Sequence, residues 1–147
     1  MKAILAHDAD PNRRLAKGSP SRYYSKDYAF TEGLVGATPL RLAAEYGEPA
    51  IVRALAAGGA DPTLGLGDGT TALMAAIAST RGFGAFRAGD RRERYLGLAD
   101  VAAKVDGEDE RLTLATAKAA IDAGVEVNAR NKDGDTALHI SHIGGAR

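Results

Sequence analysis

The apolar residues in the middle of the chain recur at helical spacing and then stop at a glycine. Leu40, Ala43 and Ala44 fall on one face of a helix. Thr38 is a good N-cap residue for that helix, and Gly47 is a good terminator because glycine adopts the backbone conformation that ends helices. The pattern predicts a short helix whose paired alanines let a second helix approach closely.

A second amphipathic segment follows at once. Pro49 suits the first position of a helix, where the N–H group that proline lacks has no partner in any case. Ile51, Val52 and Leu55 form the apolar face, and Gly58–Gly59 ends the segment before a turn. The sequence therefore predicts two packed helices followed by a projecting turn.

The same sequence motif begins again 33 residues later. Thr71 stands 33 residues after Thr38 and opens TALMAA as Thr38 opens TPLRLAA. This interval is that of the ankyrin unit. The motif T-P-L-x-x-A-A-x-x-G at 38–47 and the motif G-A-D-P at 59–62 resemble the ankyrin-repeat family closely. The resemblance implies an all-α solenoid of stacked helix–turn–helix units with projecting turns.

The repeat pattern reaches both ends of the chain and is interrupted twice. Thr136 follows Thr71 by 65 residues, about 32 more than one period. We therefore expect a single domain with two full repeats, two half-repeats and two long insertions. Its parts are a half-repeat 1–12, an insertion 13–35, a repeat 36–68, a repeat 69–133 with an internal insertion at about 80–110, and a half-repeat 134–147.

Within the second insertion, the pattern predicts a short amphipathic helix over 95–105 and a turn over 106–110. The late second helix of that unit is expected over 111–123. Ankyrin arrays normally need about three units and polar end caps. We therefore expect this chain to be either a fragment of a longer array, which we favour, or an array whose insertions serve as caps. Its uncapped ends are then expected to allow self-association.

Composition narrows the classes of function. The 19 basic and 19 acidic residues leave no net charge, so no bulk attraction to nucleic acid or to an anionic membrane is expected. The absence of cysteine excludes disulfides and thiolate chemistry. No apolar run approaches the roughly 20 residues that span a bilayer, so no membrane partner is expected.

The residues that could bind a metal or calcium ion are better explained by structural roles. His139 and His142 are spaced for a metal, but further ligands are lacking. The resemblance gives His139 a structural hydrogen-bonding role, at a place where Arg41 and Met74 stand in the earlier units. The segment 131–135 looks like a calcium loop but lacks the acid at its twelfth position. No nucleophile–base set is visible, so we expect no cofactor, no metal and no enzymatic activity.

Aromatic residues are distributed unevenly. Of eight aromatic side chains, seven lie in the two insertions, and Tyr46 alone belongs to a regular repeat. Exposed rings on loops are costly unless they pack against a partner or against the stack itself. Both explanations remain open.

The function implied by the resemblance is non-covalent binding of a protein partner. The expected contacts are the turn tips, the concave face of the first helices and the aromatic and basic insertion loops. The residues expected to bind the partner are Tyr23, Tyr24, Tyr28, Phe30, Glu45, Tyr46, Leu66, Asp68, Phe83, Phe86, Lys132 and Asp133.

Two alternatives stay open. The basic, tyrosine-bearing loop from Arg13 to Phe30 has rings on which nucleic-acid bases stack, although the neutral net charge argues against that partner. A role as the scaffold domain of a larger enzyme is the second alternative. The lack of any nucleophile, metal or cofactor motif argues against it.

Overall fold

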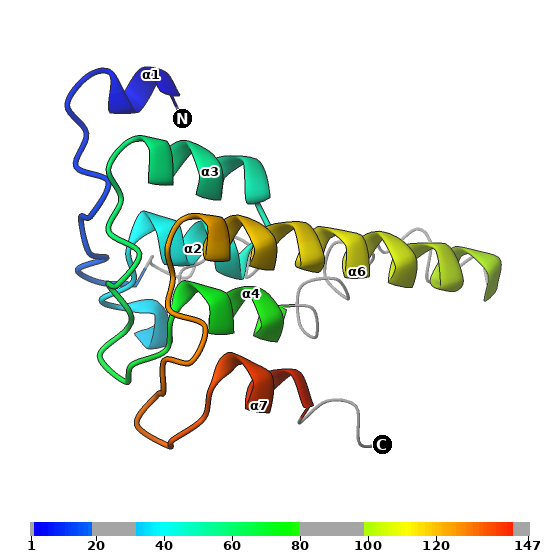
Figure 1. Ribbon diagram of the computed structural model, residues 1–147. Coiled ribbons are helices and arrows are strands. Elements are labelled where there is room, and N and C mark those ends of the chain that lie inside the picture. Colours follow the sequence, from blue (N-terminus) through cyan, green and yellow to red (C-terminus); the bar gives the residue numbers. More distant parts are fainter. Residues whose placement is uncertain (1, 19–31, 80–98, 143–147) are drawn as a thin grey trace.

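The computed structural model describes residues 2–18, 32–79 and 99–142, and all the regular structure in these ranges is helical (Figure 1). Long turns project from one side of the stack, on the left in Figure 1. In chain order they are α1 (Lys2–Leu5), the 3-10 helix η2 (Glu32–Leu34), α2 (Pro39–Glu45), α3 (Pro49–Ala57), α4 (Ala72–Ser79), α6 (Ala99–Asp122) and α7 (Ala137–His142). The predicted all-α fold is confirmed.

The central pair of helices has the ends that its sequence predicts. The side chain of Thr38 caps α2 by accepting a hydrogen bond of 3.3 Å from the backbone N–H of Arg41. Pro39 and Pro49 are the first residues of α2 and α3. Gly47, with a φ of 64°, turns the chain between the two helices.

The helices stack in two rows. The first helices of successive units pack on one another, α2 on α4 and α4 on α7. The second helices do the same, α3 on α6, and each of these also packs against the first row (Figure 1). One continuous core therefore lies between the two rows.

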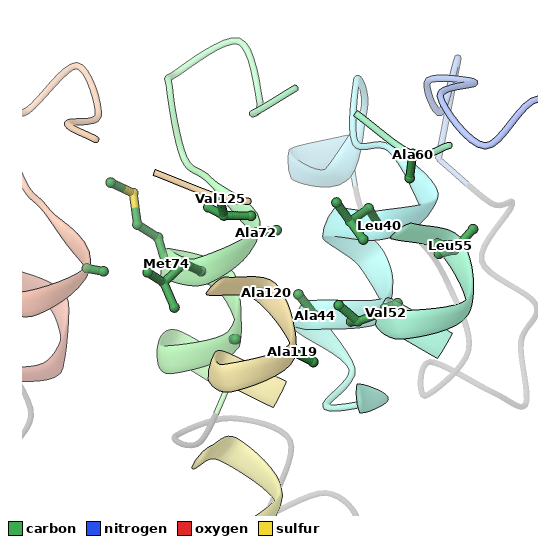
Figure 2. Packing of buried hydrophobic residues seen from close by; sticks show 14 residues of the cluster. Leu40, Ala44, Val52, Leu55, Ala60, Ala72, Met74, Ala119, Ala120 and Val125 are labelled. Atoms are coloured by element: carbon green, nitrogen blue, oxygen red, sulfur yellow. The ribbon is translucent and has the colours of Figure 1, made fainter. Parts of the chain in front are cut away.

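That core is built from a few large side chains and many alanines (Figure 2). Leu40, Val52 and Leu55 fill the space between α2 and α3, and each is at most 2% exposed. Small residues lie where neighbouring helices come closest, because a larger side chain there would hold the helices apart. The alanines at most 2% exposed in this core are Ala37, Ala44, Ala75, Ala76, Ala119 and Ala120.

Helix α6 corrects one prediction from the sequence. The expected turn over 106–110, between separate helices over 95–105 and 111–123, is wrong, because one helix of 24 residues runs from Ala99 to Asp122. A single glycine within a helix costs only about 1 kcal/mol, and the alanines, lysine, glutamates and leucine around Gly107 are good helix formers. At about 36 Å, α6 extends beyond the stack of shorter helices (Figure 1).

One apolar residue of α7 is exposed where its counterparts are buried. Leu138 stands at the place that Leu40 and Leu73 occupy in the two earlier units. It is 77% exposed, whereas they are 2% exposed. Leu114 and Ile121 of α6 are also exposed. The expected self-association through such faces stays a prediction.

Candidate functional site

The turns at the ends of the repeats 36–68 and 69–133 are joined through their backbones. The N–H of Lys132 donates a hydrogen bond of 2.8 Å to the carbonyl oxygen of Asp68. The turn that contains Asp68 is closed by a 3.0 Å bond from the N–H of Leu66 to the carbonyl oxygen of Thr70. The exposed side chains of Asp68, Lys132 and Asp133 thus stand on one hydrogen-bonded edge.

The second of these turns is organised by one asparagine. The side-chain oxygen Oδ1 of Asn131 accepts bonds from the N–H groups of Asp133 at 3.0 Å and Asp135 at 2.8 Å. Asparagine favours such turns because its short side chain can accept backbone hydrogen bonds nearby. Asn131 therefore fixes the loop from which Lys132 and Asp133 project.

Gly69 allows the two turns to approach each other. It has a φ of 82°, which side chains rarely tolerate, and a Cβ atom there would lie 3.1 Å from the Cα of Asn131. Gly134 has a similar φ of 85°, but a Cβ atom there would meet nothing within 4 Å. Gly69 is therefore required both for its backbone conformation and for the contact between turns.

We expect Gly69→Ala to destabilise the fold by about 1–3 kcal/mol, since it adds a close contact to an unfavourable φ. Gly134→Ala is the matched control, because it carries the unfavourable φ without the contact, and it should cost less. Urea unfolding of both variants measures the difference. Equal losses would show that the turn-to-turn contact contributes nothing.

Asp68 is held as a carboxylate. Burial alone would raise its pKa, but hydrogen bonds from Thr70 and the positive charge of Arg41 lower the pKa below its ordinary value. The bond from the N–H of Thr70 to Oδ1 is 2.8 Å long. Asp68 therefore presents a fixed negative charge at neutral pH.

The C-terminal end of α2 carries the other described candidates. Glu45 is the last residue of the helix, and its Oε2 atom lies 2.8 Å from Nη1 of Arg41. The side chain of Arg41 is only 6% exposed, whereas that of Glu45 is 28% exposed. Partial burial, and then the charge of Glu45, raise the pKa of Tyr46, so its hydroxyl stays protonated at neutral pH.

The residue three positions after the capping threonine differs in each unit. His139 takes the structural hydrogen bond that the resemblance implies, with Nδ1 2.8 Å from Oγ1 of Thr136. Met74 substitutes by accepting a 3.5 Å bond at its sulfur from the N–H of Thr71. Arg41 has no acceptor atom and cannot do the same.

The first turn is tied to the later turns by polar side chains. Nη1 of Arg14 donates to the carbonyl oxygens of Gly36 at 2.9 Å and Gly65 at 3.0 Å. Oδ1 of Asn12 accepts a bond of 2.7 Å from the N–H of Asp61. Arg14, one of the cations of the basic loop considered for nucleic acid, is thus bonded within the stack.

The structure describes six of the twelve residues that the sequence predicts to bind a partner. Among the described ones, Asp68, Lys132 and Asp133 come together at the turn edge, while Glu45 and Tyr46 end α2. Leu66 is half-buried, and its backbone closes the turn. The other predicted residues lie outside the described ranges: Tyr23, Tyr24, Tyr28, Phe30, Phe83 and Phe86.

Sequence reasoning missed the ion pair of Arg41 with the candidate residue Glu45. It identified this position only as a replacement for histidine. The relevant pattern was Arg41 followed four residues later by Glu45, a spacing that brings two side chains together on a helix.

Within residues 2–18, 32–79 and 99–142, no group of three or more His, Cys, Asp or Glu side chains is placed to hold a metal ion. No helix in the described part of the chain is both long and apolar enough to cross a membrane.

Comparison with known proteins agrees with this architecture. The family model described as ankyrin repeat matches residues 35–65, which contain α2, α3 and the turn that follows them. The chain contains an ankyrin repeat. Ankyrin repeats are general protein-interaction modules, and the family is generally non-catalytic.

A solved structure extends the likeness to nearly the whole chain. The ankyrin repeat domain of Bcl-3, a member of the IkappaB protein family, matches with a TM-score of 0.56 at 17% sequence identity. The match covers 95% of this chain and 40% of that one, so the chain spans less than half of the solved domain. No curated protein sequence matches the chain. The ankyrin-repeat fold expected from the motifs is confirmed.

Proposed function

We propose that this ankyrin-repeat chain binds a protein partner, without catalysis, through the turn edge of Asp68, Lys132 and Asp133 and through Glu45 and Tyr46 at the end of α2. The observation that carries the proposal is the 2.8 Å backbone bond between Lys132 and Asp68. This bond holds the exposed side chains of two units in a fixed relation. A surface that is already ordered loses less conformational entropy when it binds.

The chemistry of this surface favours a polar, sequence-selective contact. It offers both carboxylates and an ammonium group, and Tyr46 is the one aromatic residue within the described ranges. In the same proposal, the aromatic side chains of the two insertions supply the apolar anchors that interfaces need. Those side chains are Tyr23, Tyr24, Tyr28, Phe30, Phe83 and Phe86.

The proposal is tested by site-specific photo-crosslinking. A photoreactive amino acid at position 132, on the turn edge, should give a crosslinked species in native extract that excess unlabelled chain removes. The matched control places the same group at Arg53, an exposed residue of α3 in the second row of helices. We expect no competed product from position 53.

Crosslinking of equal yield from both positions would contradict a localised binding surface. The absence of any competed product from position 132 would contradict the proposal itself.

A further inference from the structure

Arg41 is a buried charge whose hydrogen-bonding capacity is largely unused. The residue is 5% exposed, and neither Nε nor Nη1 has a hydrogen-bond partner among the described residues. Glu45 lies 2.8 Å from Nη1, which makes an ion pair without hydrogen-bond geometry. Buried guanidinium groups normally bond through several of their five donors, since an unsatisfied buried donor is costly.

The repeat does not need an arginine at this place. In the next two units the equivalent residues, Met74 and His139, accept hydrogen bonds from the N–H of the threonine that precedes their helix. Arg41 only gives its backbone N–H to Thr38. Its side chain thus departs from the local pattern, with an ion pair to Glu45 as its polar contact on its own helix, and such departures are expected at functional positions.

The carboxylate that now faces Arg41 can be replaced. Glu45 ends α2, and more than a quarter of its side chain is exposed, so it can turn into solvent without disturbing the core. Its order on the helix, with the cation four residues before the acid, is also the less favourable one. Another carboxylate entering from outside would keep the charge of Arg41 paired.

We propose that Arg41 binds a carboxylate of the partner, which takes the place of Glu45 beside the guanidinium group. This inference rests on the proposed function, because Glu45 is one of the residues proposed to bind the partner. The planar fork of arginine pairs with either a carboxylate or a phosphate. A carboxylate fits better here, because Glu45 and Asp68 would repel a doubly charged anion more strongly.

The test uses the whole chain and short blocked peptides as probes. Nuclear magnetic resonance follows the Nε–H signal of Arg41 and the backbone amides of Glu45 and Tyr46. Acetyl-Gly-Glu-Gly-amide should shift these signals in a saturable way, and acetyl-Gly-Gln-Gly-amide should not. Acetyl-triglycine with a free C-terminus shows whether a terminal carboxylate serves as well as an acidic side chain.

Variants separate recognition from structure. Glu45→Gln removes the competing charge, so the glutamate peptide should bind tighter by on the order of three- to ten-fold. Arg41→Met copies the residue of the next unit, so it should keep the melting temperature while abolishing the shifts of the two amides. Arg41→Lys keeps the charge without the fork and should weaken binding.

Either of two results would overturn the inference. One is equal shifts with the glutamate and glutamine peptides, and the other is no saturable shift in either the natural chain or Glu45→Gln. If competed crosslinking from position 132 persists in that case, the binding surface stands and only the role of Arg41 fails.

Discussion

Leu55→Ala should lower the free energy of unfolding by about 2–5 kcal/mol, because it leaves a cavity between α2 and α3. Leu55 is 2% exposed and belongs to the central core cluster with Leu40 and Val52 (Figure 2). The helices on both sides are fixed by their neighbours in the stack, so they cannot close the space completely. Urea unfolding measures this loss directly when the slope of the unfolding free energy against urea concentration is the same in the variant and the natural chain.

Leu114→Ala is the matched control for that experiment. It makes the same chemical change within a helix, but Leu114 is 69% exposed. Its loss of stability should stay below about 0.5 kcal/mol. Similar losses in the two variants would mean that the apolar face between α2 and α3 is not the core of the fold.

The helices of the central unit were predictable from sequence because their information is local. Thr38, Pro39 and Gly47 set the ends of α2 through contacts within a few residues of each other. The apolar faces follow from a fixed helical period. The helix over 99–122 was not predictable in the same way. Glycine disfavours a helix and the residues that flank Gly107 favour one, so the local sequence does not decide whether the helix continues through this position.

The turn edge was predictable in its members but not in its connections. Asp68 and Lys132 were both expected to project from turns, since each follows a repeated motif. The bond between their backbones depends on how closely two units stack, and this distance is set by Gly69 and the alanines of the core. No local pattern reports such a distance.

The role of Arg41 illustrates the same limit. Sequence places it on α2 four residues before Glu45, but burial depends on what neighbouring units bring to that face. The structure shows a nearly buried side chain with two unbonded nitrogen atoms. A residue that differs from its counterparts in other repeats therefore needs the structure to show whether the difference affects stability or binding.

The alanines between the helices define the second large expected effect. Ala44 is fully buried, on a helix that packs against both α3 and α4 (Figure 2). Ala44→Leu adds three carbon atoms where no space exists, so α2 must move away from a neighbour or adopt a strained side-chain conformation. We expect a loss of about 1–3 kcal/mol in the free energy of unfolding.

Ala50→Leu makes the same change on the exposed side of α3 and serves as its control. Alanine and leucine have similar helix propensities, so this variant should unfold within about 0.5 kcal/mol of the natural chain. If Ala44→Leu were as stable as Ala50→Leu, the close approach of the helices would not depend on small side chains. The spacing between units, and with it the bond between the turns at Asp68 and Lys132, would then need another explanation.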